Sequence, residues 1–447
     1  MLFIRRAKRG VHPKENKFTR DLPIRRLDSF DTITIPLDMQ LGPGCSPLVA
    51  KGDTVLVGQQ IGEPLGGWSV PVHSSCSGTV QKVRMEILSD GDTAHYVTIK
   101  NDHNYTISPE VTPPEINNKD DFVAALRSSG LVGQGGAAFP TFVKMNPPPE
   151  KKVDLLLVNG AECEPYITSD HRVMVEYPDE VIKGCRIAAH WLGVEEVIIC
   201  IEDNKPEAVT ALRQQINEQV KSNESEAPIK IMTLPTMYPH GAEKVQIMKL
   251  TGRVVPVGGL PLDVGVVVQN VQTIRFIATY IATGMPLVRR IITLEGSAMK
   301  QAGNYDVPIG AHIDDVIEAG GGTVSPPGKI IMGGPMMGKA IDEVNRPVLK
   351  HNNTILAFTE EEAQLPEESA CIFCGECMRA CPMQLMPNYL DTAARNLDID
   401  ALNSNSVLNC IECGCCSYVC PAKRYLVQNI IIGKNLLRNA QKKGKVD

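Results

Sequence analysis

The stretch CIFCGECMRACP (Cys371–Pro382) and its near copy CIECGCCSYVCP (Cys410–Pro421) determine the organisation of the C-terminal part of this chain. Each stretch has the spacing C-x2-C-x2-C-x3-C-P, so eight cysteines stand in two identical patterns. The second copy contains one additional cysteine, Cys415. Nine of the fourteen cysteines in the chain therefore lie in one short region, which indicates a unit built on thiols.

This spacing favours iron–sulfur clusters over zinc or disulfides. Three thiolates spaced three residues apart on a tight loop reach different irons of one cluster, and the fourth points to another cluster. Zinc sites usually combine two separate pairs, and soft thiolates without neighbouring histidine suit iron–sulfur chemistry. The basic N-terminus lacks the apolar run of a secretory signal, so the disulfides of an exported protein are not expected. We predict two [4Fe–4S] clusters and transfer of single electrons.

The crossing of the fourth cysteine predicts the two ligand sets. The first set consists of Cys371, Cys374, Cys377 and Cys420. The second set consists of Cys381, Cys410, Cys413 and Cys416. Cys415 has two interpretations, a small buried residue beside a cluster or a replacement ligand, and the first is favoured.

Length and charge limit the other possibilities. At 447 residues the chain is too long for one core, and about 150 residues per domain suggests about three domains. A net charge of −6 without a basic stripe argues against a nucleic-acid partner. The most apolar long window, Val264–Val288, is interrupted by polar residues, so we expect a buried segment of a globular domain and no membrane span.

The N-terminal region reads as β structure. Short β-patterned runs broken by glycine and proline fill residues 28–110, and their spacing resembles a biotinyl/lipoyl-type barrel sandwich. Carriers of that class present a lysine at the turn between the hairpins. Here that turn is Pro64–Gly67 and has no lysine, so we expect a scaffold or docking role and no covalent swinging arm.

The middle of the chain alternates apolar strands with helices, which is typical of a parallel α/β sheet. The expected helices are Asp120–Ser129, Asp179–Leu192 (ended by Gly193) and Pro206–Val220, and the expected strands are Val153–Val158, Glu195–Ile201 and Ile229–Leu234. Short β-like runs return from Arg290 to Ala340, and the acidic stretch Glu360–Ser369 reads as a linker.

Two motifs in this middle region suggest a nucleotide site. Gly133–Ala138 fits G-x-G-x-x-G/A, but a helix precedes it where a dinucleotide fingerprint requires a strand, so a simple turn is an equally good interpretation. Its glycines would let backbone N–H groups approach a phosphate, with Lys144 nearby. Asn159–Pro165 lies at the C-terminal end of a parallel strand, where open sheets bind ligands. Glutamates there suit a sugar or ring better than a phosphate, unless the loop is simply exposed.

Taken together, these motifs resemble a known family. The segments GLVGQGGAAFPTFVK, NGAECEPYITSDHRVM, YPHGAEK, VVQNVQT and KIIMGGPMMG, followed by the double cysteine run, are similar in sequence and order to the C subunit of the Rnf electron-transport complex (RnfC). The middle also resembles the flavin-bearing NADH subunit of respiratory complex I. The similarity covers nearly the whole chain.

The resemblance implies a non-covalent FMN and an NAD(H) site. The residues expected near the phosphates and flavin are Gly133, Gly135, Gly136 and Lys144. Those expected near the isoalloxazine and nicotinamide are Asn159, Glu162 and Glu164. The FMN site would be completed by Tyr238, Gly241, Glu243, Asn270 and Thr273. Ala138 stands where the family commonly has glycine, and a positive φ there would cost about 1 kcal/mol.

The implied fold is a multidomain α/β arrangement with four parts and a linker. The expected limits are a barrel-sandwich-like β domain (1–115), an FMN/NADH-binding α/β domain (116–288), an SLBB-like β-grasp domain (289–345), a linker (346–369) and a two-[4Fe–4S] ferredoxin-like α domain with a basic tail (370–447).

The implied function is that of an oxidoreductase and translocase subunit in a membrane-bound ferredoxin:NAD oxidoreductase. Electrons would pass between NAD(H), FMN, the two clusters and a partner, because a flavin accepts a hydride pair and passes electrons on singly. No catalytic acid, base or nucleophile is expected, although Glu162 and Glu164 are candidates for tuning the flavin. Membrane subunits would move Na+ or H+.

The resemblance also implies partners and a location. The expected partners are the other subunits, especially a ferredoxin-like iron–sulfur subunit, and the expected location is peripheral, on the cytoplasmic side of the inner membrane. Two alternatives stay open: an electron relay that holds clusters only, and a soluble RnfC-like reductase of the cobalamin-reductase or proline-reductase-associated kind.

Overall fold

A four-stranded parallel sheet in the computed structural model carries the Asn159–Pro165 motif at the end of one of its strands. Its strand order is β11-β10-β9-β12, and every neighbouring pair is parallel. The strands are β9 (Leu155–Gly160), β10 (Glu196–Glu202), β11 (Ile229–Leu234) and β12 (Val266–Asn270). The prediction of a parallel α/β sheet is confirmed, and the polar motifs follow the carboxyl ends of β9 and β12.

Helices cover both faces of this sheet, which is why its strands are largely apolar. The helices packed in the larger core are α3 (Ser169–Glu176), α4 (Pro178–Leu192), α5 (Pro206–Val220) and α7 (Val271–Thr283). Helix α6 (Glu243–Thr251) covers the other face, and the short η1 (Pro261–Val264) precedes β12. Gly193 ends α4 in the left-handed conformation with φ +70°, as the sequence predicts.

Two short helices flank the glycine-rich motif. Helix α1 (Lys119–Ser128) begins at Asn118, whose side chain accepts a hydrogen bond from the Asp121 N–H. Helix α2 (Thr141–Lys144) follows the glycines. The glycine-rich loop, residues 130–139, therefore connects two helices and does not leave a strand.

The N-terminal region folds into two small β-sheets, consistent with a barrel sandwich. One sheet contains β2 (Thr32–Pro36), β8 (Thr93–Asn101), β7 (Gly78–Ile87) and β4 (Thr54–Val55). The other contains β3 (Cys45–Pro47), β5 (Gln60–Pro64) and β6 (Val72–His73). All pairs are antiparallel, so alternate side chains form the buried interior.

A six-stranded mixed sheet forms the third part, and it is larger than the sequence suggests. Its strands, in order, are β1 (Ile24–Arg26), β14 (Gly303–Pro308), β13 (Arg289–Glu295), β17 (Thr354–Phe358), β15 (Lys329–Met332) and β16 (Lys339–Ile341). Helix α8 (Ile313–Ala319) packs against it.

Two expectations about this region were wrong. The expected linker 346–369 contains β17, which is fully buried between β13 and β15. Strand β1 lies in the range assigned to the barrel but pairs with β14. The sequence IRR of β1 has no apolar alternation, and β17 is only five residues long. Neither strand could therefore be assigned to this sheet from the sequence.

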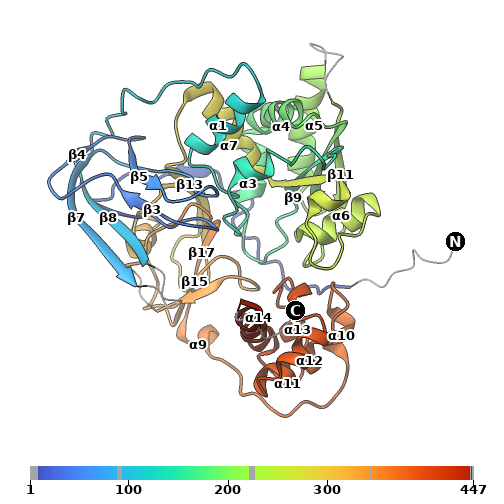
Figure 1. The fold of residues 1–447 in the computed structure, drawn as a ribbon. Helices are drawn as coiled ribbons and strands as arrows, with labels where there is room; N and C mark the ends of the chain where they lie inside the picture. The colour runs from blue at the N-terminus through green and yellow to red at the C-terminus, as the bar shows by residue number, and fades with distance from the viewer. Residues whose placement is uncertain (1–8, 88–92, 221–226, 343–344, 443, 445–447) are drawn as a thin grey trace.

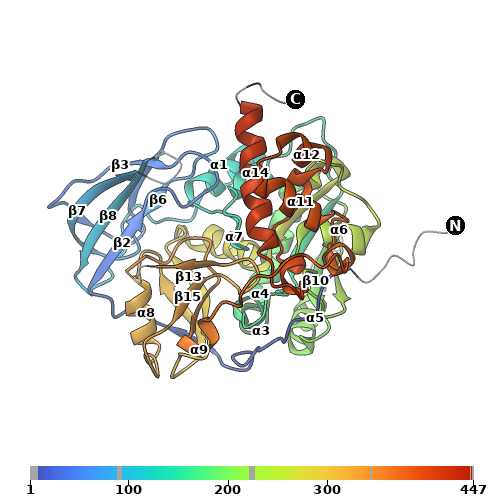
Figure 2. The same cartoon turned by 90° about the horizontal axis from the view of Figure 1, so that it is seen from below.

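The C-terminal part is a helical lobe with a core of its own. Its helices are α10 (Glu376–Ala380), α11 (Pro387–Arg395), α12 (Ile399–Ser404), α13 (Cys415–Tyr418) and α14 (Leu426–Lys442), with the short η2 (Val407–Asn409). Helix α9 (Glu360–Ala363) lies on the segment that leads to it. Figure 1 shows this lobe below the three other parts, and Figure 2 shows α14 running along it.

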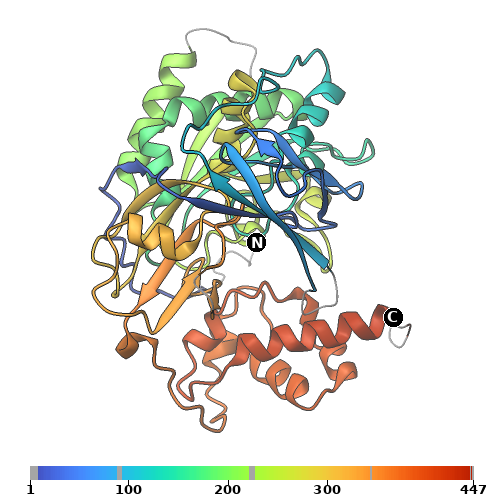
Figure 3. The ribbon, with the colours of Figure 1, turned by 90° about the vertical axis from the view of Figure 1, so that its left-hand side faces the viewer.

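The structure describes residues 9–87, 93–220, 227–342, 345–442 and 444. The last residues of the expected basic tail lie outside this part of the chain. In the side view, the cluster lobe extends beneath the other parts (Figure 3). Within the described residues, no helix has the length and apolar character needed to cross a bilayer.

Close packing of α4 on α7 gives a test of the fold. A Cβ added at Gly184 would lie 2.0 Å from the Ile274 carbonyl oxygen. We therefore expect Gly184→Ala to lower the free energy of unfolding by about 2 kcal/mol. Gly67→Ala is the matched control, because a Cβ there meets nothing within 4 Å. Equal thermal midpoints for the two variants would contradict this helix packing.

Candidate functional site

A cavity of about 400 Å³ opens at the carboxyl ends of β9 and β12. The glycine-rich loop, the segment before α6 and the loop after β15 surround it. Ten residues predicted from the sequence line it: Gly133, Gly135, Lys144, Asn159, Glu162, Glu164, Tyr238, Gly241, Glu243 and Asn270. The structure thus gathers separate sequence motifs around one space.

Two predicted residues do not line this cavity. Gly136 is exposed, with φ +109° and open space around its Cα. Thr273 is buried behind the loop, where its hydroxyl accepts a hydrogen bond from the Gln134 N–H at 3.0 Å. Thr273 therefore supports the glycine-rich loop from α7 and does not reach the cavity.

The sequence did not predict the other residues that line the cavity. They include Phe139, Cys163, Asp170, Gln269, Met337, Asn353 and Ile411. Asp170 and Gln269 adjoin predicted residues, and the polar pattern at the end of β12 was a usable signal for Gln269. Asn353 and Ile411 come from distant segments, and only the tertiary fold brings them here.

Glycine is required where the loops approach one another. A Cβ on Gly241 would lie 2.8 Å from the Cys163 sulfur, and one on Gly135 would lie 3.3 Å from the Asn270 Cβ. Ala138 has φ +52°, so the sequence-based concern about this position is correct. Its methyl group packs with Val70 and Val132, which offsets part of the backbone cost.

The segment 161–167, called the glutamate loop below, places two carboxyl groups at the cavity. The Glu162 carboxylate accepts hydrogen bonds from the N–H groups of Asp170 and His171 at the start of α3. The Glu164 carboxylate accepts one from the Met336 N–H at 3.1 Å. Burial raises the pKa of both groups, that of Glu164 to about 7.

Two lysines, Lys144 and Lys244, line the cavity, and Lys144 does so from the glycine-rich side. The Lys144 ammonium donates to the Glu243 carboxylate at 2.8 Å and to the Val268 carbonyl at 3.1 Å. It also lies 5.8 Å from the centre of the Phe139 ring. These contacts join α2, α6 and β12, so Lys144 fixes three sides of the cavity as well as supplying charge.

A buried polar network supports the cavity floor. The Asp170 carboxylate accepts hydrogen bonds from the Asn270 and Gln272 amides at 2.7 and 2.8 Å. Arg290, 1% exposed on β13, donates to Gln272 at 2.9 Å and to the side chain of Gln134 in the glycine-rich loop. This network links the mixed sheet to the loop and restricts its movement.

The barrel docks on the glycine-rich loop. The Arg127 guanidinium donates to the carbonyls of Gly66 and Ser69, each at 3.1 Å. The Trp68 ring meets the Phe139 ring edge to face at 5.5 Å. The turn that carries the lysine in carrier proteins is therefore in contact with the cavity wall, which supports a scaffold role for the barrel.

The eight regular cysteines lie around two further cavities. One is lined by Cys371, Cys374, Cys377 and Cys420. The other is lined by Cys381, Cys410, Cys413 and Cys416, together with Cys415. Each set combines three cysteines of one run with the fourth of the other, which is the grouping that the sequence predicts.

The spacing of these sulfurs suits a cluster better than a single ion. A tetrahedral zinc site with Zn–S bonds of about 2.3 Å places its sulfurs about 3.8 Å apart. In the described chain, no three of the cysteine sulfurs lie within 4.8 Å of one another. A hydrogen bond with the Cys415 thiol lowers the pKa of Cys413, so the additional cysteine contacts a predicted ligand.

The large cavity adjoins the second cysteine set. Ile411 lines both spaces. The Tyr238 hydroxyl donates to the Cys413 carbonyl at 2.7 Å, and Tyr238 also lines the large cavity. A Cβ on Gly414 would lie 2.8 Å from the Met336 carbonyl oxygen. The two sites are thus in direct contact through three short segments.

The large cavity fits a polar planar cofactor. Its volume lies in the range of cofactor sites, about 300–1,000 Å³. Two of its lining residues have buried polar atoms with no hydrogen-bond partner in the described part of the chain, Oε1 of Glu164 and Nε2 of Gln269. Such atoms are rare in native structures unless a ligand satisfies them. Ring edges with both donors and acceptors would do so here.

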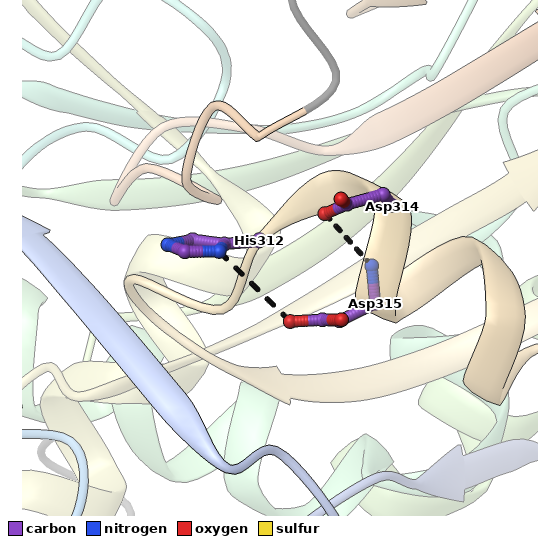
Figure 4. A group of neighbouring side chains, drawn as sticks. All are labelled: His312, Asp314 and Asp315. Carbon is purple, nitrogen blue, oxygen red and sulfur yellow. Dashed lines mark hydrogen bonds and ion pairs between the residues drawn. The ribbon is translucent and has the colours of Figure 1, made fainter. Parts of the chain in front are cut away.

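Among the described residues, one other group of potential metal ligands lies outside these cavities. The side chains of His312, Asp314 and Asp315 come together at the start of α8 (Figure 4). His312 contacts Asp315 at 3.9 Å and Thr34 at 2.9 Å. The Asp314 carboxylate accepts a hydrogen bond from the Asp315 N–H. These contacts account for the grouping, because the three residues lie together at the start of α8.

Family models agree with this division of the chain. The Nuo51 FMN-binding domain matches residues 126–279, and the 4Fe-4S dicluster domain matches residues 365–421. The RnfC barrel sandwich hybrid domain matches residues 5–104, and the SLBB domain matches residues 291–340. The fold and site therefore define an electron-transfer protein that combines an FMN-binding domain with a dicluster domain.

Curated relatives identify the family. The C subunit of the Na(+)-translocating ferredoxin:NAD(+) oxidoreductase complex of Acetobacterium woodii is 42% identical, over 98% of each chain. The C subunit of the proton-translocating complex of Clostridium ljungdahlii is 40% identical, over 98% of this chain and 95% of the relative. This chain belongs to the RnfC family, the C subunits of ion-translocating ferredoxin:NAD(+) oxidoreductase complexes.

A solved structure shares the fold. It is an NAD+-reducing [NiFe]-hydrogenase in the H2-reduced state, with a TM-score of 0.51 and 19% identity over 74% of this chain and 67% of that chain. At this identity the likeness concerns the fold alone. The arrangement that the two chains share is therefore not peculiar to the RnfC family.

The crossed cysteine sets give a direct test. Cys381→Ala should remove the cluster near the Cys410 run and leave the cluster of its own run, because Cys381 lines the other cavity. Iron content and EPR of anaerobically prepared protein would measure the loss. Cys415→Ala is the control, and we expect it to retain both clusters. Damage confined to the cluster of the Cys371 run would refute the crossing.

Burial of Glu164 predicts a pH dependence of stability. Its folded pKa of about 7 exceeds the ordinary value of 4.5, so the free energy of unfolding falls as pH rises between these values and is constant above. Glu164→Gln should remove this decline and stabilise FMN-free protein by about 3 kcal/mol at pH 8, with a much smaller effect at pH 5.

The thermal midpoint of each protein at several pH values measures this effect. Glu361→Gln, an exposed substitution on α9, is the control and should behave as the wild type throughout. A Glu164→Gln variant whose stability difference from the wild type is the same at pH 5 and pH 8 would contradict the buried carboxyl.

Proposed function

We propose that this chain passes electrons between NAD(H) and the other subunits of a ferredoxin:NAD oxidoreductase complex. The contact between the large cavity and the second cysteine set carries this proposal, because Ile411 belongs to both. FMN, when bound, would exchange a hydride pair with NAD(H) and single electrons with the clusters. The lining residues predicted from the sequence would bind and orient it.

The chain's own residues have defined tasks in this proposal. Gly133 and Gly135 let the glycine-rich loop approach the ligand, while Gly241 leaves room beside Cys163. Lys144 offers positive charge for a phosphate. Asn159 donates to the Gly241 carbonyl at 2.8 Å and so fixes the floor of the site. No acid, base or nucleophile is needed.

The geometry supports a definite order for the two clusters. The set of Cys410 adjoins the large cavity through Tyr238, Ile411 and Met336. The set of Cys371 shares no lining residue with that cavity. We propose the path NAD(H), FMN, the Cys410 cluster, the Cys371 cluster and then the partner.

The outer cluster lies where a partner can approach. Cys374 is exposed, and the neighbouring side chains of Ile372 and Phe373 are 66% and 76% exposed. Exposed apolar residues beside a redox centre suit a transient partner. A ferredoxin-like iron–sulfur subunit is the partner that we propose.

The relatives' names support membership in an ion-translocating complex. One names Na(+) and the other names the proton at similar identity, so we propose ion coupling without choosing the ion. We propose a peripheral position on the cytoplasmic side of the membrane, attached through other subunits. We also propose the domain limits given above, with β1 and β17 assigned to the β-grasp sheet.

An electron relay with clusters alone is less well supported. A vestigial flavin pocket would be expected to fill with side chains, since protein interiors are close-packed. Here a cavity of about 400 Å³ persists, lined by orphaned polar atoms of Glu164 and Gln269. A soluble RnfC-like reductase would share these features. Association with membrane subunits would distinguish the proposed complex from such a reductase.

Anaerobic reconstitution tests the proposal. Purified protein should contain about eight irons and eight sulfides, as two cubanes require, and bind one FMN per chain. Addition of NADH should bleach the flavin absorbance and produce cluster EPR signals. A flavin that stays oxidised under anaerobic NADH would overturn the proposal, and EPR signals from clusters without flavin would favour the relay.

A further inference from the structure

The glutamate loop is a thin wall between two cavities. The large cavity lies in front of it, and a second cavity of about 140 Å³ lies behind it. Cys163 and Tyr238 line both spaces. The back cavity is also lined by His12, Glu15 and Lys17 of the N-terminal segment. That segment therefore supports the site from the side away from the ligand.

The N-terminal strap, residues 10–20, is fastened along this wall. Val11 and Tyr238 exchange two backbone hydrogen bonds, at 2.8 and 3.0 Å. The Tyr166 N–H donates to the Glu15 carbonyl at 2.8 Å. The hydroxyls of Thr19 and Thr168 form a buried hydrogen bond at 2.6 Å. The strap is thus bonded to the segment around Tyr238 and to the glutamate loop, and both of these contain residues that line the large cavity.

Lys17 makes the central contact of the strap. Its ammonium group donates to three carbonyls of the glutamate loop, those of Glu162, Glu164 and Ile167, at 2.7, 2.9 and 2.6 Å. Lys17 as a whole is partly exposed, and burial lowers the pKa of its ammonium group. Lys205 donates in the same way to the Ala161 carbonyl at 2.7 Å.

Capture of these carbonyls sets the direction of the loop's N–H groups. In a trans peptide the C=O and N–H bonds point to opposite sides. The lysines hold the carbonyls of Ala161 and Glu162, so the N–H groups of Glu162 and Cys163 point away from them. No acceptor among the described residues bonds these two N–H groups. The Cys163 nitrogen lies near Gly241, which lines the large cavity.

The charges around Lys17 are balanced. Lys205 and Glu202 form an ion pair at 3.2 Å, and both are about 1% exposed. Glu162 is the remaining carboxyl that interacts with Lys17. Removal of the Lys17 charge would leave an excess of negative charge beside the cavity. In this buried setting, such a charge is poorly screened.

We propose that Lys17 is a positioning residue, which holds the glutamate loop so that two backbone N–H donors face the bound flavin. Its buried positive charge also favours the reduced, more electron-rich form of that flavin. The inference rests on the proposed function. It assigns the N-terminal strap, which lies outside the FMN-domain match, to the flavin site.

Lys17→Met in the full chain tests this role, with Lys14→Met as the matched control on an exposed position of the same strap. Titration of flavin-depleted protein with FMN should give a dissociation constant about tenfold higher for Lys17→Met. The flavin midpoint potential, measured at saturating FMN without NADH, should become more negative. Lys14→Met should match the wild type in both measurements.

The outcomes separate the inference from the proposed function. If the wild type binds no FMN, the proposed function fails. A second outcome overturns the inference alone. In it, the wild type binds FMN, and Lys17→Met keeps its cluster content and has the same FMN affinity and flavin potential as the wild type. Should Lys17→Met not fold, Lys17→Arg decides. The planar guanidinium of arginine cannot donate from a single nitrogen to three carbonyls, so FMN should bind more weakly to Lys17→Arg. Unchanged FMN affinity would overturn the inference.

Discussion

Contact between the loop around Tyr238 and the cysteine loop around Cys413 is the constraint on which the arrangement depends. The Tyr238 hydroxyl bonds the Cys413 carbonyl, and the tyrosine itself is 2% exposed. Tyr238 lines the large cavity and belongs to the same hydrophobic cluster as Cys413 and Cys415. Separation of these two loops would part the large cavity, where we propose that FMN binds, from the second cysteine set.

The other parts of the molecule hold this contact in place. The strap bonds the backbone of Tyr238, and Arg9, just before it, donates to the Cys381 carbonyl at 3.4 Å. The loop after β15 inserts between Glu164 and Gly414. Segments from the N-terminus, the α/β domain, the β-grasp sheet and the cluster lobe therefore converge within one small region. This convergence explains why the cavity is lined by residues far apart in the sequence.

Buried ionisable groups are concentrated at the glutamate loop. Lys17 and Lys205 occupy the back of the loop, while Glu162 and Glu164 lie at the front. The lysines bond backbone carbonyls of the loop, and the two carboxylates accept hydrogen bonds from backbone N–H groups, so each buried group has polar partners. These hydrogen bonds hold the loop from both sides, and a well-held loop suits a site whose chemistry is carried by a cofactor.

The sequence by itself determined the cysteine sets, the parallel sheet and most of the residues around the cavity. These features follow from local spacing and periodicity, such as the repeat that begins at Cys371 and the apolar run of β9, and from the family resemblance of the loop motifs. Only the tertiary structure decided the sheet positions of β1 and β17, the position of Thr273 behind the glycine-rich loop, and the contacts of Lys17. Most of these contacts join residues more than one hundred positions apart, and no local pattern records which distant backbone groups a side chain will meet.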